Sequence, residues 1–123
     1  MTPKLGFIAL IALAAMTSAA AADCRIIGGG FRLAQNESLS ATGLLSHGRS
    51  CILNFRSYST AQFTSGSIVS RPSNGTLSQV GALLFRYAPK SGFKGVDQYA
   101  LRVCGIGSGG PGCATITYNM TVE

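Results

Sequence analysis

Residues 71–103 read RPSNGTLSQVGALLFRYAPKSGFKGVDQYALRV and contain three predicted β-strands separated by two turn signals. Asn74-Gly75 is a strong hairpin signal, because both residue types tolerate the positive φ angles of a type I′ turn. A short strand is expected over residues 76–80. Residues 83–87 then alternate between two faces with the period of a half-buried strand, which Pro89 ends, and the same alternation resumes over residues 99–103.

The segment between these last two strands predicts how one end of the core is closed. In residues 91–95, two glycines flank Phe93, which suits a loop that folds back and places the phenyl ring against the core. Asp97 follows, and its short carboxylate side chain can accept hydrogen bonds from nearby backbone.

These residues carry a family resemblance. The order Pro-x-Asn-Gly-Thr-Leu, Tyr-x-Pro and Gly-Phe-x-Gly-x-Asp-x-Tyr resembles the bacterial immunoglobulin-like and cadherin-like repeat domains of secreted and surface proteins. The resemblance covers the C-terminal part of the chain, including a closing strand over residues 114–122, and it implies a fold rather than a function. Members usually occur as tandem repeats with acidic calcium sites, whereas this chain has one copy and four acidic residues. The matching positions are Pro72, Asn74, Gly75, Thr76, Leu77, Tyr87, Pro89, Gly92, Phe93, Gly95, Asp97 and Tyr99.

The first 22 residues have the layout of a secretory signal peptide. Lys4 precedes an apolar run over residues 5–15, and the small residues Ala20, Ala21 and Ala22 precede Asp23. The apolar run is too short to cross the roughly 30 Å hydrocarbon core of a bilayer comfortably. We therefore expect export to the periplasm or cell exterior, cleavage after Ala22, and a mature domain over residues 23–123 with no transmembrane segment.

The mature domain is small and basic, and it contains all four cysteines. Removal of Lys4 leaves nine Lys and Arg residues against four acidic residues, a net charge of +5. An even number of cysteines in a small exported domain predicts disulfides. Three pairings are possible. Strand parity favours an outward Cys104–Cys113 bridge across a hairpin, which leaves Cys24–Cys51 as an inward pair.

The rest of the chain predicts an all-β domain. We expect early strands over residues 24–27 and 31–41, a loop over 42–50, a strand over 50–56 and a loop over 57–65. Seven to eight short strands with turns between them favour a single immunoglobulin-like or cadherin-like antiparallel β-sandwich.

No motif predicts a reaction, a cofactor or a metal. Residues 105–110 match G-x-G-x-x-G, but a strand follows where dinucleotide binding requires a helix, so we interpret them as a hairpin tip. His47 is the sole histidine, and we interpret it as an exposed loop residue rather than a member of a catalytic triad. Four scattered acids are a poor ligand set for calcium.

The positive charge is the remaining indication of function. Strand parity predicts that three arginines point outward and that two lysines share one loop. If the strands are neighbours in one sheet, the arginines form a stripe for phosphate, sulfate or carboxylate groups. The alternative is a charge that only keeps the soluble domain from self-association. The residues of this predicted patch are Arg56, Arg86, Arg102, Lys90 and Lys94.

Three functions follow from these observations. The preferred one is an exported, non-catalytic binding or adhesion-type domain whose partner is an anionic protein, glycan or lipid surface, and not nucleic acid. The second is a structural or accessory subunit of a cell-envelope complex. The third is a small enzyme inhibitor or hydrolase.

Overall fold

The computed structural model describes residues 24–28, 30, 32–46, 48–55 and 61–123. The predicted signal peptide, His47 and Arg56 lie outside these residues. The described residues form eight β-strands and one short 3-10 helix, which confirms the predicted all-β class. The elements are β1 (Cys24–Gly28), η2 (Leu33–Gln35), β2 (Ser38–Leu45), β3 (Cys51–Asn54), β4 (Gln62–Ser70), β5 (Gly75–Gly81), β6 (Leu84–Pro89), β7 (Gly95–Gly107) and β8 (Gly110–Val122).

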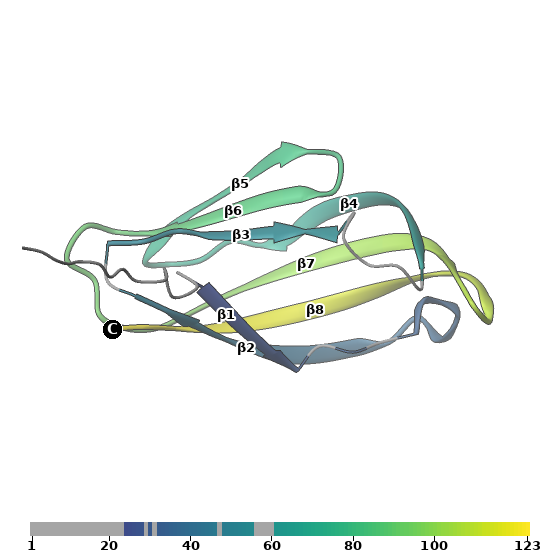
Figure 1. Cartoon of the computed structure of the whole chain (residues 1–123), viewed down its shortest axis with the longest axis horizontal. Coiled ribbons are helices and arrows are strands. Elements are labelled where there is room, and N and C mark those ends of the chain that lie inside the picture. The colour runs from purple at the N-terminus through teal and green to yellow at the C-terminus, as the bar shows by residue number, and fades with distance from the viewer. Residues whose placement is uncertain (1–23, 29, 31, 47, 56–60) are drawn as a thin grey trace, which may run out of the picture.

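The strands form two sheets arranged as a sandwich (Figure 1). The larger sheet has the strand order β1-β2-β8-β7-β4, and the smaller has the order β3-β6-β5. The sandwich was predicted to be antiparallel, and one pairing differs: β2 runs parallel to β8, with Ser38 opposite Thr115 and Leu45 opposite Val122. A parallel pair needs a long connection. Here strands β3 to β7 lie between the two partners, so no local sequence signal marks the pairing.

The core lies between the sheets and follows the predicted alternation. Phe85 and Tyr87 of β6 are fully buried, and so are Tyr99, Leu101 and Val103 of β7. Three tyrosine rings form its centre, because Tyr87 stacks on Tyr99 at 5.1 Å between ring centroids and Tyr99 stacks on Tyr118 at 5.3 Å. Phe93 packs against this core from the β6–β7 loop, as the sequence predicted.

The predicted hairpin at Asn74-Gly75 is wrong. The turn joins β4 of the larger sheet to β5 of the smaller sheet, so the two flanking strands are not paired with each other. Asn74 is absent from the residues with positive φ, and so is Gly75. Glycine is needed at position 75 for a different reason: an added Cβ atom would lie 2.6 Å from the Ala88 carbonyl oxygen and 2.8 Å from the Tyr87 ring.

Three element boundaries differ from the sequence prediction. The expected strand over residues 31–41 is interrupted by the 3-10 helix η2, which buries Leu33 and ends at Asn36 in a left-handed conformation. Strand β2 then continues to Leu45 through part of the predicted 42–50 loop. Strand β4 likewise begins at Gln62, inside the predicted 57–65 loop.

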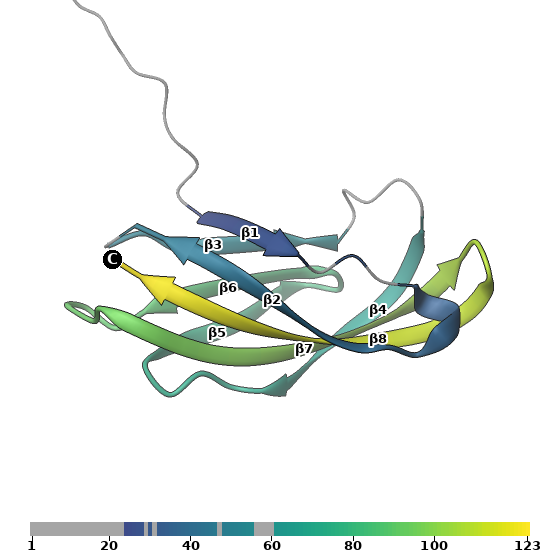
Figure 2. The same ribbon diagram turned by 90° about the horizontal axis from the view of Figure 1, so that it is seen from below.

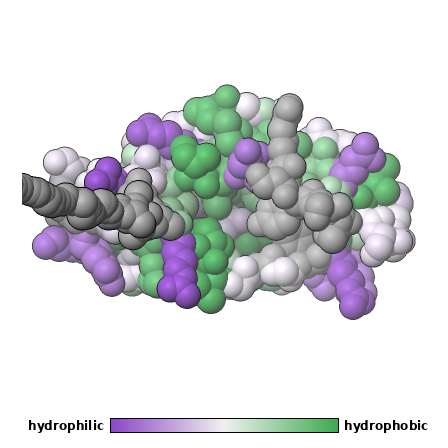
Figure 3. Space-filling view, in the orientation of Figure 1, coloured by the Kyte–Doolittle hydropathy of each residue, from purple (hydrophilic) through white to green (hydrophobic). Residues whose placement is uncertain are grey.

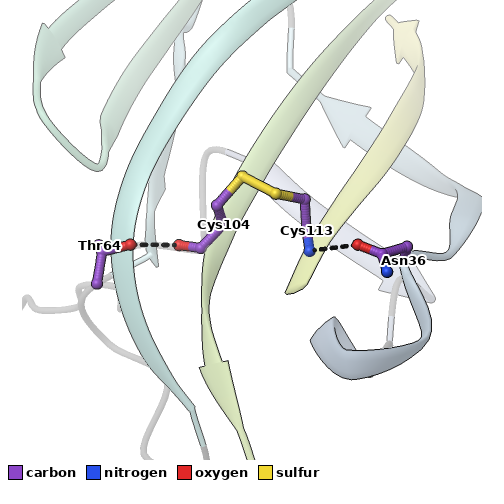
Figure 4. Close-up of a disulfide and its surroundings, with 4 residues drawn as sticks. All are labelled: Asn36, Thr64, Cys104 and Cys113. Atoms are coloured by element: carbon purple, nitrogen blue, oxygen red, sulfur yellow. Dashed lines mark hydrogen bonds between the residues drawn. A yellow bond between two sulfur atoms is a disulfide. The ribbon is translucent and has the colours of Figure 1, made fainter. Parts of the chain in front are cut away.

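Both predicted disulfides are confirmed. Cys24–Cys51 joins β1 to β3 and therefore ties one sheet to the other. Cys104–Cys113 joins β7 to β8 across a directly opposed pair (Figure 4). Side chains of neighbouring segments form hydrogen bonds with the backbone of both cysteines of this second bridge. The Thr64 hydroxyl donates to the Cys104 carbonyl, and the Cys113 N–H donates to the Asn36 side-chain oxygen. Disulfides indicate an oxidising, extracytoplasmic environment.

Side chains hold the two sheets together on the side opposite the Cys24–Cys51 bridge. The Gln79 amide of β5 donates to the Gly66 carbonyl of β4 at 2.9 Å. Just after β4, the Arg71 guanidinium donates to the Leu77 carbonyl of β5 at 2.8 Å. The exposed edges of β4 and β5 are thus partly covered by their own side chains, which limits edge-to-edge association.

The surface mixes polar and apolar residues. Figure 3 shows hydrophilic and hydrophobic groups interspersed on the face that it draws. Exposed apolar side chains include Ile52 and Val80 on the smaller sheet and Val96 on the larger. Within the described part of the chain, we find no helix with the length and apolar character needed to span a bilayer.

Candidate functional site: a basic pocket at one end of the sandwich

Two connections and the C-terminus lie at one end of the sandwich. Figures 1 and 2 show the β2–β3 connection, the β6–β7 loop and the C-terminus at the same end, opposite the β7–β8 hairpin tip. A partly open pocket of about 300 Å³ lies among the first two. Its lining residues come from the segment before β3, from β6 and from the β6–β7 loop: Gly48, Arg49, Ser50, Arg86, Ala88, Pro89, Lys90, Ser91, Gly92 and Phe93.

The pocket brings three cations together. Arg86 lies between the buried residues Phe85 and Tyr87, so its side chain points away from the core on the outer face of the smaller sheet. The antiparallel β3–β6 register pairs Cys51 with Tyr87, which carries Arg49 toward the end of β6 and toward Lys90. No acidic residue is among the described lining residues. Converging cations create a positive potential that attracts anions.

Arg86 and Lys90 differ from ordinary paired surface charges. Among the described residues, neither side chain has a hydrogen-bond or ion-pair partner. Both are exposed to solvent. Arg86 can offer a planar fork of N–H donors that matches a phosphate or carboxylate group, and Lys90 can offer a compact point charge.

The β6–β7 loop supplies backbone donors beside these cations. The Phe93 N–H donates to the Lys90 carbonyl and closes a turn over residues 90–93. Gly92 has a φ of +81°, which the third position of a type II turn requires and which glycine adopts without strain. The N–H groups of Ser91 and Gly92 have no hydrogen-bond partner within the described residues, so they can bind an anion.

A buried carboxylate fixes the position of this loop. Asp97 is 4 % exposed, and it accepts hydrogen bonds from the Tyr87 hydroxyl at 2.7 Å and from the backbone N–H groups of Ser73 and Asn74. The Asn74 carbonyl in turn accepts the Lys90 N–H at 2.8 Å. A continuous chain of hydrogen bonds therefore links the core to Lys90. The Gln98 N–H also donates to Asp97, at 3.0 Å, which confirms the predicted bond to nearby backbone. The bonds to Ser73 and Asn74, and the link through that turn to Lys90, could not be read from the sequence.

The two central tyrosines stay protonated at neutral pH. Burial, and then the hydrogen bond to Asp97, raises the pKa of Tyr87 above its ordinary value. Burial also raises the pKa of Tyr99, with Tyr118 and Tyr87 adding to the effect. Tyr87 can therefore donate to Asp97 throughout the physiological range. In contrast, the buried Tyr99 hydroxyl has no hydrogen-bond partner among the described residues.

The pocket contains two residues of the predicted basic patch and one that sequence reasoning missed. Arg86 and Lys90 meet in it, whereas Lys94 follows the lining residues in the same loop and is exposed. Arg102 lies on β7 of the larger sheet, so the condition for a single arginine stripe, strands that share one sheet, is not met. Arg49 was missed because its place beside β6 depends on the β3–β6 pairing.

A second hollow lies where β3 ends and β4 begins. Its volume is about 390 Å³, and Phe55, Phe63 and Leu83 are among its lining residues. None of its described lining residues is charged. All four cysteines are in disulfides, and the described residues hold no cluster of three or more His, Cys, Asp or Glu side chains suited to a metal ion.

Comparisons with known proteins identify no family. No protein-family model matches the chain, and no curated protein matches it. Among solved structures, a 2,6-sialyltransferase of a Vibrionaceae Photobacterium species, in a ternary complex with CMP and lactose, is 18% identical with a TM-score of 0.42. A sialyltransferase of Photobacterium damsela is 16% identical with a TM-score of 0.39. The matches cover 72% and 71% of this chain but only 18% of each enzyme chain. Similarity this low indicates neither a family nor a function.

Proposed function

We propose that this protein is an exported, non-catalytic immunoglobulin-like domain that binds anionic groups on envelope or host-surface molecules through the basic pocket. The observation that carries the proposal is the convergence of Arg86 and Lys90 with Arg49, from two segments distant in sequence, on one pocket whose described lining residues include no acid.

Several features support export and a binding role. The two disulfides fit an oxidising compartment, and residues 1–22 have the pattern of a cleaved leader. The resemblance of residues 72–99 to bacterial immunoglobulin-like and cadherin-like repeats of secreted and surface proteins favours an exported β-sandwich and is silent on function. A β-sandwich of this kind holds its loops at fixed ends, where binding residues are commonly found.

The charges in the pocket favour a compact anion on a larger molecule. Arg86 and Lys90 have no acidic partner among the described residues, so a ligand would not have to displace one. Both side chains are exposed, and screening by salt therefore limits what each contributes. Useful affinity would come from several anionic groups presented together, as on an acidic glycan or a lipopolysaccharide layer.

The test is the binding of the oxidised protein to immobilised heparin and to lipopolysaccharide at increasing salt. We expect the Arg86→Ala/Lys90→Ala double variant to bind more weakly and with a shallower salt dependence. The Arg25→Ala/Arg102→Ala double variant is the matched control, since it loses the same charge from exposed positions on the larger sheet. Equal losses in the two variants would mean that net charge, and not the pocket, binds the polyanion.

A further inference from the structure

The basic pocket has two chemically different sides. Arg49, Arg86 and Lys90 provide positive charge, whereas Ala88, Pro89 and Phe93 provide apolar surface. Phe93 is partly buried and packs against the core, so its ring is held in place. A bare inorganic anion would use only the charged side. The apolar side gains dispersion contacts only from a ligand that also has carbon-bound surface.

The volume of the pocket indicates the size of the group that it takes. About 300 Å³ is roughly the volume of ten molecules of liquid water. A free phosphate ion fills only part of this space. One six-membered sugar ring with a small substituent fits, and because the pocket is partly open, the ring can remain linked to a longer chain.

The remaining lining residues suit a ligand rich in hydroxyl groups. Ser50 and Ser91 can each donate and accept a hydrogen bond. The N–H groups of Ser91 and Gly92, which have no hydrogen-bond partner among the described residues, add donors beside the cations. At Gly48 and Gly92, an added Cβ atom would have no heavy atom within 4 Å, so open space lies next to the backbone at both glycines.

From these observations we infer that the basic pocket binds a single sugar ring that carries one compact anionic substituent, a phosphate, sulfate or carboxylate group. Arg86 and Lys90 hold the anion, with Arg49 adding to the positive potential, and Phe93 packs on the carbon face of the ring. This inference rests on the proposed function, and it names the unit of the anionic surface that the pocket recognises.

Isothermal titration of the oxidised protein tests the inference with five probes: glucose 6-phosphate, glucuronic acid, glucose, inorganic phosphate and phenyl phosphate. We expect glucose 6-phosphate to bind about tenfold more tightly than either phosphate or glucose, because both sides of the pocket then contribute. Glucuronic acid should also bind more tightly than glucose. Phenyl phosphate should bind more weakly than glucose 6-phosphate, since it cannot use the hydroxyl-binding residues.

Variants test which residues bind the anionic group and which bind the sugar ring. Arg86→Gln should weaken both phosphate and glucose 6-phosphate, whereas Arg102→Gln should weaken neither. Phe93→Leu should remove most of the preference for glucose 6-phosphate over phosphate. Because Phe93 also packs against the core, the exposed Ser91→Ala provides a second variant that should reduce glucose 6-phosphate binding without affecting folding.

Two outcomes would overturn the inference. One is glucose 6-phosphate binding no more tightly than phosphate, and the other is phenyl phosphate binding as tightly as glucose 6-phosphate. Neither result would remove the proposed function if heparin or lipopolysaccharide binding still required Arg86 and Lys90. If heparin and lipopolysaccharide binding also did not require Arg86 and Lys90, the pocket would not be an anion site.

Discussion

The same substitution, tyrosine to phenylalanine, should change the stability of the protein differently at two positions in the centre of the core. Tyr87 and Tyr99 are both fully buried, and their rings stack on each other. The Tyr87 hydroxyl donates to Asp97 at 2.7 Å, whereas the Tyr99 hydroxyl has no partner among the described residues. Replacement by phenylalanine removes only the hydroxyl in each case and keeps the ring stack.

The expected change in the free energy of unfolding depends on whether each hydroxyl has a hydrogen-bond partner. A hydrogen bond to a charged group contributes about 1.5–3 kcal/mol, so Tyr87→Phe should lower the free energy of unfolding by about 2 kcal/mol. Removing a buried hydroxyl that has no partner removes an uncompensated desolvation penalty. Tyr99→Phe should therefore leave stability unchanged or raise it by about 1 kcal/mol. The two variants should differ by about 2–3 kcal/mol, and by roughly 10 °C or more in melting temperature for a domain of this size.

Urea denaturation of the oxidised protein, followed by circular dichroism, measures both variants. A double-mutant cycle of Tyr87→Phe with Asp97→Asn should give a coupling energy of about 1 kcal/mol or more, because the two groups share one hydrogen bond. If Tyr87→Phe and Tyr99→Phe lost the same stability, or if the cycle gave no coupling, the assignment of Asp97 as the anchor of the β6–β7 loop would be refuted.

Three further predictions concern glycine, pH and the disulfides. Gly75→Ala should cost about 1–3 kcal/mol in the same urea assay, because its Cβ would meet the Ala88 carbonyl and the Tyr87 ring, whereas Gly30→Ala, with open space, should be neutral. The melting temperature should fall once the pH exceeds about 10, because unfolded tyrosines ionise there while burial raises the pKa of Tyr87 and Tyr99 in the fold; a flat profile to pH 12 would contradict this. Replacing the Cys24–Cys51 pair by serines should lower the free energy of unfolding by about 1 kcal/mol more than replacing the Cys104–Cys113 pair, because the Cys24–Cys51 bridge closes the longer loop, with a sequence separation of 27 against 9. An equal or reversed order would refute the loop-entropy reasoning.

The sequence predicted well those features that depend on strand periodicity. The alternation over residues 83–87 and 99–103 identified the buried side chains correctly, because side chains on a strand point to opposite faces in turn. Ala100 is the exception, since it has the outward parity and is nevertheless buried. The same parity identified both disulfides. Phe93 was placed correctly because it acts from its own loop, and the bond of Asp97 to nearby backbone was placed correctly because its donor, Gln98, is the next residue. The bonds of Asp97 to Ser73 and Asn74 depend instead on the tertiary fold.

Features that depend on which strands become neighbours were not predictable in this way. Asn74-Gly75 signals a turn, but a turn can join two sheets as readily as two paired strands, and here it does the former. Parity also indicated that Arg86 and Arg102 point outward, without indicating that they belong to different sheets. Arg49 joins the site only through the β3–β6 pairing, which is set by the tertiary fold rather than by its own sequence.

The most direct test of the account is chemical-shift mapping of the oxidised, ¹⁵N-labelled protein during titration with a short sulfated oligosaccharide. If the basic pocket is the binding site, the largest changes should fall on residues 48–50 and 86–93, and the amides of Arg25 and Arg102 should not move. Changes centred on Arg102, or spread evenly over both sheets, would contradict it.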